Sequence, residues 1–247
     1  MKRMKHMSTL LCMLGFAVIL LLPFTAQAAA KKNIYVLKKC KTTTVINKQT
    51  SSFTVQYKYN KKGLAASKTD AVTTKYTYNS KNQLTKVDMN GVIGKYTYNK
   101  KGLIKNYTNS IFSSSRNKNN YIKYNKKNQI IETYGKYLVD DQIIKRTFTY
   151  NKSGKLSKIT DSLSGTTTYS YDKKGNIKSV KDSNGTVTRK LTYKSGRVSK
   201  YMMKLPFGSV TKTYTYQKLN IDKNYVAKVQ EQQWYLLNFE TIPEELF

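Results

Sequence analysis

Acidic residues and histidine are scarce in this sequence. The 247 residues include 13 Asp and Glu against 45 Lys and Arg, and the one histidine is His6. His6 lies in a segment that we expect to be removed, so the mature chain would contain no histidine. Catalysis by histidine and His-ligated metals are therefore excluded. Cysteine is also scarce, with two residues. A hydrophobic content of 39% with 12% aromatics is enough for a core, which excludes wholesale disorder.

The first thirty residues predict an exported protein. Basic residues between Lys2 and Lys5 precede an apolar run from Leu10 to Leu22, and Ala26-Gln27-Ala28 follows it. This is the order of a secretory signal peptide cleaved after Ala28. The apolar run is shorter than the roughly 20 residues of a membrane-spanning helix. We therefore expect a secreted mature chain, extracellular or associated with the cell wall, without a transmembrane segment.

The expected mature chain is strongly basic and has one cysteine. Removing the three basic residues of the signal from 45 leaves 42 against 13 acidic residues, a formal net charge of +29. Cys40 has no second cysteine to pair with, which excludes an internal disulfide. Its neighbours Lys38, Lys39 and Lys41 would favour a thiolate, and an ordinary strand residue is the alternative that we favour.

A tyrosine-containing motif recurs eight times. In copies such as YKYNKKGL (57–64), YTYNKKGL (96–103) and YSYDKKGN (169–176), two tyrosines separated by one residue are followed by Asn or Asp, two lysines and Gly. The repeat-defining second tyrosines are Tyr59, Tyr78, Tyr98, Tyr124, Tyr150, Tyr171, Tyr193 and Tyr216. Their intervals of 19 to 26 residues suit one β-hairpin per copy.

Each copy has a local physical explanation. An aromatic-x-Tyr pair places two rings on one face of a strand. Asn or Asp at the first turn position with Gly at the fourth indicates a type I turn that ends in a left-handed residue and a bulge. Asn82 and Asn128 replace that Gly, which Asn tolerates. In the return strands the apolar residues are three apart, as in Leu156 and Ile159, so a bulge or a strand covered on both faces is expected.

The fold class predicted is therefore all-β. About sixteen short antiparallel strands would form a meander of eight hairpins, coiled into an open shell or a barrel-like sheet. Asn-Gly hairpin turns are expected at 88–91 and 182–185, and a long Ser/Asn-rich loop at Asn109–Asn120. We expect a signal peptide at 1–28, an N-terminal strand region at 29–52, the repeat domain at 53–220 and a C-terminal cap at 221–247. No helix longer than one turn is expected within 53–220.

The C-terminal cap breaks the pattern, because it is apolar and contains the only tryptophan. We interpret Val226–Val229 and Trp234–Phe239 as a last hairpin that covers the sheet edge. A short helix through 230–233 is the alternative structure. A tail that docks a partner is the alternative function.

These repeats resemble the RHS or YD-repeat family. Thr166-Thr167-Thr168-Tyr169-Ser170-Tyr171-Asp172-Lys173-Lys174-Gly175 follows the family pattern Tyr-Asp-x-x-Gly, and other copies have Asn in place of Asp. The resemblance implies a long antiparallel sheet that coils round. Large members of the family enclose toxin cargo, but this chain is short and lacks their self-cleaving segment, so encapsulation is not expected.

Lysines of the turns are the candidate binding site. The predicted polyanion-binding residues are Lys61, Lys62, Lys100, Lys101, Lys126, Lys127, Lys173 and Lys174. Stacked hairpins would bring them to one rim, which could bind an anionic cell-wall polymer or an acidic glycan. Solubility and protection of strand edges are the simpler explanation of these lysines. The export signal disfavours nucleic acid, and a structural or protein-partner module or a component of an RHS-type toxin or adhesion system is the alternative function.

No enzymatic constellation stands out. Asp140-Asp141 is the one adjacent carboxylate pair of the repeat body, and a turn is expected there. Catalytic residues, a metal site and a cofactor are all predicted to be absent. On the strands the face opposite the tyrosines would carry Lys and Thr, for example Lys58, Lys75 and Thr97, whereas an outer-membrane barrel would need an outward apolar band.

Overall fold

The computed structural model describes residues 30–110, 120–136 and 143–237. The predicted signal peptide, Asp140-Asp141, most of the Asn109–Asn120 loop and the last ten residues lie outside these ranges. Residues 31–247 form one unit, and the description below concerns that unit alone. In the described part of the chain, no helix is long and apolar enough to cross a membrane.

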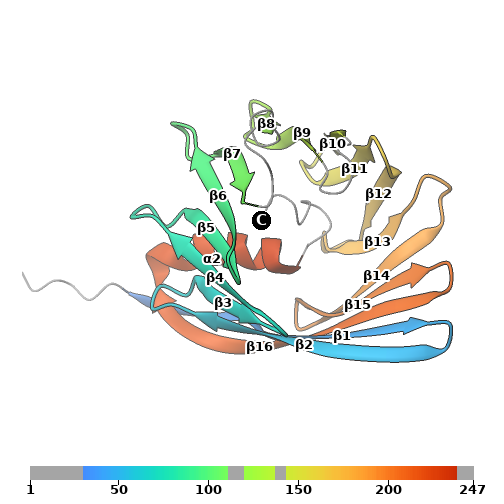
Figure 1. Cartoon of the computed structure of the whole chain (residues 1–247), viewed down its shortest axis with the longest axis horizontal. Coiled ribbons are helices and arrows are strands. Elements are labelled where there is room, and N and C mark those ends of the chain that lie inside the picture. The colour runs from blue at the N-terminus through green and yellow to red at the C-terminus, as the bar shows by residue number, and fades with distance from the viewer. Residues whose placement is uncertain (1–29, 111–119, 137–142, 238–247) are drawn as a thin grey trace, which may run out of the picture. The chain divides into compact units, whose positions relative to one another are not determined.

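One antiparallel sheet of sixteen strands and one helix make up the described structure (Figure 1). The elements are β1 (Lys31–Ile46), β2 (Gln49–Tyr59), β3 (Ala65–Thr69), β4 (Thr73–Tyr78), β5 (Leu84–Met89), β6 (Val92–Tyr98), β7 (Ile104–Asn109), β8 (Tyr121–Tyr124), β9 (Ile130–Lys136), β10 (Ile143–Tyr150), β11 (Leu156–Asp161), β12 (Gly165–Tyr171), β13 (Ile177–Lys181), β14 (Val187–Lys194), β15 (Arg197–Leu205), β16 (Gly208–Asp222) and α2 (Lys223–Leu237). The predicted all-β meander is confirmed, and the described residues between 53 and 220 include no helix.

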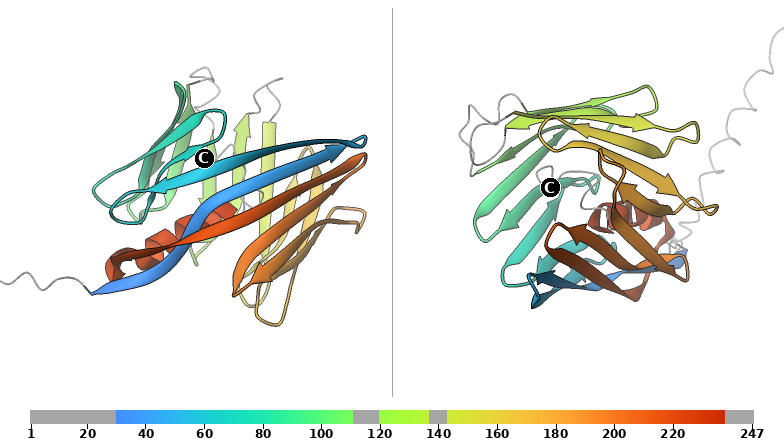
Figure 2. Two further views of the ribbon diagram at one scale, coloured as in Figure 1. Left: turned by 90° about the horizontal axis from the view of Figure 1, so that it is seen from below. Right: turned by 90° about the vertical axis from the view of Figure 1, so that its right-hand side faces the viewer.

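The sheet curls round until it is nearly closed, like a barrel. Its strand order runs β7-β6-β5-β4-β3-β2-β1-β16-β15-β14-β13-β12-β11-β10-β9-β8. Strands therefore pair with their sequence neighbours, while β1 also pairs with β16. The break in the order falls between β7 and β8, and there the Tyr124 hydroxyl donates to the Ile104 carbonyl at 3.0 Å. Both views in Figure 2 show the strands curving around one interior.

The eighth copy departs from the prediction, because no turn follows Tyr216. β16 continues through Tyr216 to Asp222, and Tyr216 pairs with Leu37 of β1. Gln217 stands where the first six copies have Asn or Asp, so the side-chain oxygen that would cap their kind of turn sits one methylene further from the backbone. The N-terminal strand region thus supplies the return strand of the last repeat. This pairing ties the two ends of the repeat array together.

The predicted turn geometry is confirmed. In the first copy, Gly63 N donates to Asn60 O at 2.9 Å and Asn60 N donates to Leu64 O at 2.9 Å. The Asn60 side-chain oxygen accepts from the backbone of Lys62 and Leu64, which explains why Asn or Asp starts the turn. Asn82 and Asn128 have φ of 59° and 60°, the left-handed conformation expected of them. The seventh copy is shorter and places both Ser195 and Gly196 in that conformation.

The bulge expected in the return strands is present. Tyr150 pairs with Leu156 and Phe148 with Ile159, so the register shifts by one residue between them. The extra residue brings two apolar residues that are three apart to the same face. Corresponding shifts occur beside Tyr59, Tyr78, Tyr98, Tyr124, Tyr171 and Tyr193.

The two Asn-Gly links differ from each other. Asn90 and Gly91 are both left-handed, with φ of 51° and 91°, and form the expected two-residue turn. At the second link Gly185 is left-handed and Asn184 is not, so the expected turn type is wrong there. Asp182 accepts from the backbone of Asn184 and Thr186, which stabilises the longer turn with a bulge.

The C-terminal hairpin that we predicted is wrong, since Lys223–Leu237 form helix α2. The alternative, a helix through 230–233, is confirmed, although the helix is longer than expected. Asp222 caps its start by accepting from Asn224 N at 2.8 Å. Val226, Val229, Gln233 and Leu236 are buried, and their spacing of three and four residues is that of one helix face. That face packs on the inner side of the sheet, against clusters that include Leu37 and Leu64.

The core lies on the concave face, where the motif aromatics point. Tyr57, Tyr96, Phe148, Tyr169 and Tyr214 are buried. Residues between them on the same strands, for example Lys58, Thr77 and Thr97, are exposed. The predicted division into an aromatic inner face and a polar, basic outer face is therefore confirmed.

Candidate functional site

Turns that follow the tyrosine strands lie at one end of the sheet. They comprise residues 60–63, 79–82, 99–102, 125–128, 151–154, 172–175 and 194–196, and we call their lysines the lysine rim. The strands before these turns alternate with their return strands, so they all run in one direction. Side chains link consecutive turns, since Gln83 Nε2 donates to Gly102 O at 3.2 Å and Gln129 Nε2 to Gly154 O at 2.8 Å. Lys155 Nζ likewise donates to Gly175 O at 3.1 Å.

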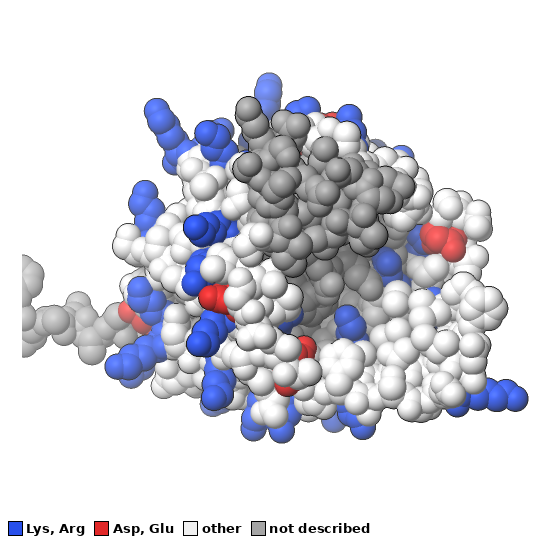
Figure 3. All heavy atoms as spheres, viewed as in Figure 1, with Lys and Arg blue, Asp and Glu red and all other residues white. Residues whose placement is uncertain are grey.

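The lysine rim is mostly exposed, as the prediction requires. Ten of its members are exposed, namely Lys61, Lys81, Lys100, Lys101, Lys126, Lys127, Lys152, Lys173, Lys174 and Lys194. Figure 3 shows Lys and Arg side chains projecting along the left edge, where Figure 1 draws the ends of β3 to β7. Lys81, Lys152 and Lys194 were not among the predicted site residues, although the same turn positions could have identified them.

Lys62 differs from the other predicted site residues. It is half-buried, its Nζ donates to Asn82 Oδ1 at 2.7 Å, and it lies over the Tyr225 ring at 5.4 Å from the centroid. This lysine connects two turns and helix α2. We therefore leave it out of the exposed binding set.

Acidic residues are distributed unevenly between the two ends. Asp172 is the acid of the rim turns, and its side chain accepts from the Asn176 side chain and backbone, which lowers the pKa of its carboxyl. In the described part of the chain no rim lysine forms an ion pair. Asp222, the last residue of β16, is a further acid at this end, because its neighbour Ile221 lies against Gly63 of the first rim turn. The rim lysines therefore outnumber the acids near them, and their positive charge is mostly uncompensated.

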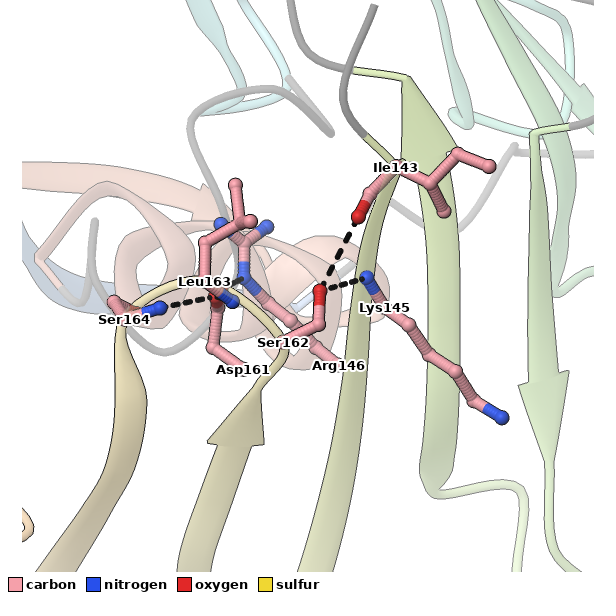
Figure 4. Close-up of polar contacts among 7 residues, drawn as sticks. All are labelled: Ile143, Lys145, Arg146, Asp161, Ser162, Leu163 and Ser164. Atoms are coloured by element: carbon pink, nitrogen blue, oxygen red, sulfur yellow. Dashed lines mark hydrogen bonds and ion pairs between the residues drawn. The ribbon is translucent and has the colours of Figure 1, made fainter.

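The links between repeats form the opposite end of the sheet, which we call the link end. Asp70, Asp88, Asp161 and Asp182 lie there and accept hydrogen bonds from backbone N–H groups of their own turns. Figure 4 shows one such link. Burial opposes the ionisation of Asp161, but Ser164 N, Leu163 N and the Arg146 side chain outweigh it and lower the pKa. The Ser162 hydroxyl connects this link to β10, since it accepts from Lys145 N at 3.0 Å.

Exposed apolar side chains also gather at the link end, a feature that we did not predict. Leu163 is 51% exposed and Phe207 is 76% exposed. The turn that contains Phe207 lies beside the turn between β1 and β2, since Asn47 N donates to Phe207 O at 3.1 Å. Other exposed members are Ile46, Val72, Met89 and Ile143. Leu163, Val72 and Phe207 lie in the links between strands, and these positions could have revealed them, because turn residues are ordinarily polar.

The repeat-defining tyrosines form a hydrogen-bonded ladder around the sheet. Each hydroxyl donates to a backbone carbonyl on the strand before it. The acceptors are Leu37 for Tyr59, Ala65 for Tyr78, Leu84 for Tyr98, Ile104 for Tyr124, Ile130 for Tyr150, Leu156 for Tyr171, Ile177 for Tyr193 and Val198 for Tyr216. These tyrosines therefore join repeats to one another and are structural residues.

Cys40 is a core residue. It is buried with Leu37, Val55 and Tyr57, and burial raises the pKa of its thiol. Lys39 and Lys41 are exposed, because neighbouring strand residues point to opposite faces. The thiolate suggested by the sequence is therefore contradicted, and the interpretation as an ordinary strand residue holds.

Comparison with known proteins agrees with the repeat pattern. The RHS Repeat family matches residues 150–187, which confirms the resemblance over that segment. No curated protein sequence matches the chain. Solved structures with similarity include TcdB2-TccC3-TEV, at 13% identity and a TM-score of 0.33, covering 70% of this chain and 11% of that one. The Photorhabdus luminescens Tc holotoxin pore matches at 14% identity and a TM-score of 0.33, covering 78% of this chain and 14% of that one. A DUF1329 family protein from Desulfovibrio piger matches at 11% identity and a TM-score of 0.29, covering 80% of this chain and 87% of that one.

Proposed function

We propose that this chain, which carries an RHS repeat at residues 150–187, is a non-enzymatic binding module for anionic polymers. The lysine rim would bind a polymer of the cell envelope or an acidic glycan outside the cell. The observation that supports this most strongly is the division of charge. Ten exposed lysines lie at one end, where Asp172 and Asp222 are acids, while Asp70, Asp88, Asp161 and Asp182 lie at the other end.

The geometry of the rim suits an extended ligand. Successive turns are two strands apart, which corresponds to about 10 Å at the strand spacing of a β-sheet. A linear polyanion could contact one turn after another and release its condensed counterions. Ammonium groups act as point charges, so this site would select charge density over chemical identity.

Solubility is the competing explanation of the lysines, and two variants separate it from binding. The rim variant replaces Lys61, Lys100, Lys101, Lys126, Lys127, Lys173 and Lys174 with Gln. The strand-face variant replaces seven exposed lysines of the outer strand faces with Gln, namely Lys41, Lys58, Lys75, Lys95, Lys105, Lys178 and Lys190. Both lose the same charge, and exposed substitutions change stability by about 0.5 kcal/mol or less each.

Binding to immobilised poly(glycerol phosphate) and polygalacturonate tests the proposal. We expect the rim variant to lose most of its binding to both polymers, while the strand-face variant keeps most of it. Equal losses would mean that net charge alone attracts the polymers, and unchanged binding by both variants would exclude electrostatic recognition.

A protein-partner module is the second candidate, and the link end favours it. Phe207 and Leu163 are large apolar side chains, exposed at 76% and 51%, where the acids of the turns reduce the positive charge. Such positions are typical of protein contacts. Replacing both residues with Ser should abolish capture of a protein partner and leave polyanion binding unchanged.

A further inference from the structure

Two consecutive glutamines of α2 make the same hydrogen-bond pattern on two neighbouring repeats. Leu37 N donates to Gln233 Oε1 at 2.7 Å, and Gln233 Nε2 donates to the Tyr59 hydroxyl at 3.2 Å. The Tyr59 hydroxyl donates to Leu37 O at 2.5 Å. The three bonds close a ring that contains one carboxamide, one hydroxyl and one backbone residue.

Gln232 forms the second ring. Ala65 N donates to Gln232 Oε1 at 2.8 Å, and the Tyr78 hydroxyl donates to Ala65 O at 2.7 Å. Gln232 Nε2 donates to the Tyr78 hydroxyl. Because the same three groups meet in the same order twice, the pattern belongs to the repeat and recurs with it.

The repeat creates this site because one backbone residue, beside the bulge, is left out of the strand-to-strand hydrogen bonding. Ala65 lies opposite Tyr59 next to the bulge, and Asn60 N bonds to Leu64 O just before it. The N–H and C=O groups of Ala65 therefore point away from β2 and toward β4. Pairing of β3 with β4 begins only at Ser67, so Tyr78 and Gln232 satisfy Ala65 instead.

Six further repeats have the same arrangement without a glutamine. Their tyrosines, Tyr98, Tyr124, Tyr150, Tyr171, Tyr193 and Tyr216, donate to Leu84, Ile104, Ile130, Leu156, Ile177 and Val198. In the Tyr171 copy, for example, pairing of β11 with β12 begins at Lys158, two residues after Leu156. These six tyrosines are partly exposed, and no side chain of the described residues donates to their hydroxyls.

We propose that these six positions are binding sites for primary carboxamides, provided by Gln or Asn side chains of a bound polypeptide. A primary carboxamide has a C=O and an N–H on the same side, so it accepts from the backbone N–H and donates to the hydroxyl at once. A trans secondary amide has these groups on opposite sides. A carboxylate has no donor, and an ammonium group has no acceptor.

The seated helix indicates what kind of ligand fits. α2 is itself a polypeptide that places Gln232 and Gln233 on two sites while Val229 and Leu236 pack on apolar clusters. The inner face near the other sites is similar, since Phe148, Ile159 and Tyr169 form a cluster there. Adjacent sites lie about 10 Å apart across two strands, within reach of neighbouring Gln side chains on one segment.

Titration of the ¹⁵N-labelled mature protein with propionamide tests this proposal. We expect saturable shifts of the backbone amide signals of Leu84, Ile104, Ile130, Leu156, Ile177 and Val198. N-Methylpropionamide and propionate, at the same concentrations, should not produce them. Tyr171→Phe should remove the response at Leu156 and leave the other five.

A peptide with the sequence of residues 223–237 provides the second measurement. It should shift the same signals at lower concentration than propionamide, and the peptide with Gln232→Met and Gln233→Met should not. Equal responses to propionamide and N-methylpropionamide, or no response to either propionamide or the Gln peptide, would overturn the proposal. This outcome is independent of whether the lysine rim binds polyanions.

Discussion

Tyr171→Phe tests whether the tyrosine ladder stabilises the sheet. Tyr171 is partly buried and donates to Leu156 O at 2.5 Å, a carbonyl that faces the next repeat at the bulge. The substitution keeps the ring and removes this one hydrogen bond. A hydrogen bond of this kind contributes about 0.5–1.5 kcal/mol net, so the free energy of unfolding should fall by about 1 kcal/mol. For a chain of this size that corresponds to a Tm lower by about 2–4 °C.

Tyr35→Phe is the matched control. Tyr35 is 50% exposed, its ring lies against Arg197, and its hydroxyl forms no hydrogen bond within the described residues. Urea unfolding should show a lower midpoint for Tyr171→Phe at an unchanged m value, and no change for Tyr35→Phe. If the two variants were equally stable, the ladder hydrogen bonds would contribute nothing, and the ring packing alone would hold the repeats together.

Three further predictions concern the break between β7 and β8, two glycines of turns, and the buried tyrosines. Tyr124→Phe should speed amide hydrogen exchange in β7 and β8 more than elsewhere, because its hydroxyl bridges the break in the strand order; uniform acceleration would contradict this. Gly63→Ala should destabilise more than Gly185→Ala in the same unfolding assay. Both glycines have a left-handed φ, but a Cβ added at Gly63 would lie 3.0 Å from the Ile221 side chain. A Cβ added at Gly185 would have no neighbouring heavy atom within 4 Å. Burial raises the pKa of Tyr78, Tyr98, Tyr124, Tyr193 and Tyr216 to about 12. Since the unfolded pKa is about 10, stability should be complete below pH 10 and fall as the pH rises toward 12, which absorbance at 295 nm and circular dichroism would detect together.

Local patterns predicted the repeat unit well. Aromatic-x-Tyr, Asn or Asp and a left-handed Gly each specify geometry within a few residues, and the structure has that geometry in the first six copies. The spacing of Leu156 and Ile159 left two explanations, a bulge or a strand covered on both faces, and the structure has the bulge. The lysine rim followed from the same reasoning, because stacked hairpins bring equivalent turn positions together.

Long-range partners were not accessible to the same reasoning. The pairing of Tyr216 with Leu37 joins residues from opposite ends of the repeats, and no local pattern encodes it. Helix α2 could have been found from the buried positions Val226, Val229, Gln233 and Leu236, whose spacing is helical. The roles of Gln232 and Gln233 depend on backbone groups left free by bulges in distant strands, so they became visible only in the folded chain.

The salt dependence of polyanion binding tests the central claim most directly. Affinity for poly(glycerol phosphate) should be measured between about 50 and 200 mM salt for the wild-type chain, the rim variant and the strand-face variant. We predict that log affinity falls linearly with log salt for the wild type. On the scale of about 0.9 per contact known for duplex DNA, the slope of the rim variant should be shallower by up to about 6. The strand-face variant should keep the wild-type slope. Identical slopes for the two variants, or a wild-type affinity that does not depend on salt, would contradict the claim that the lysine rim is the binding site.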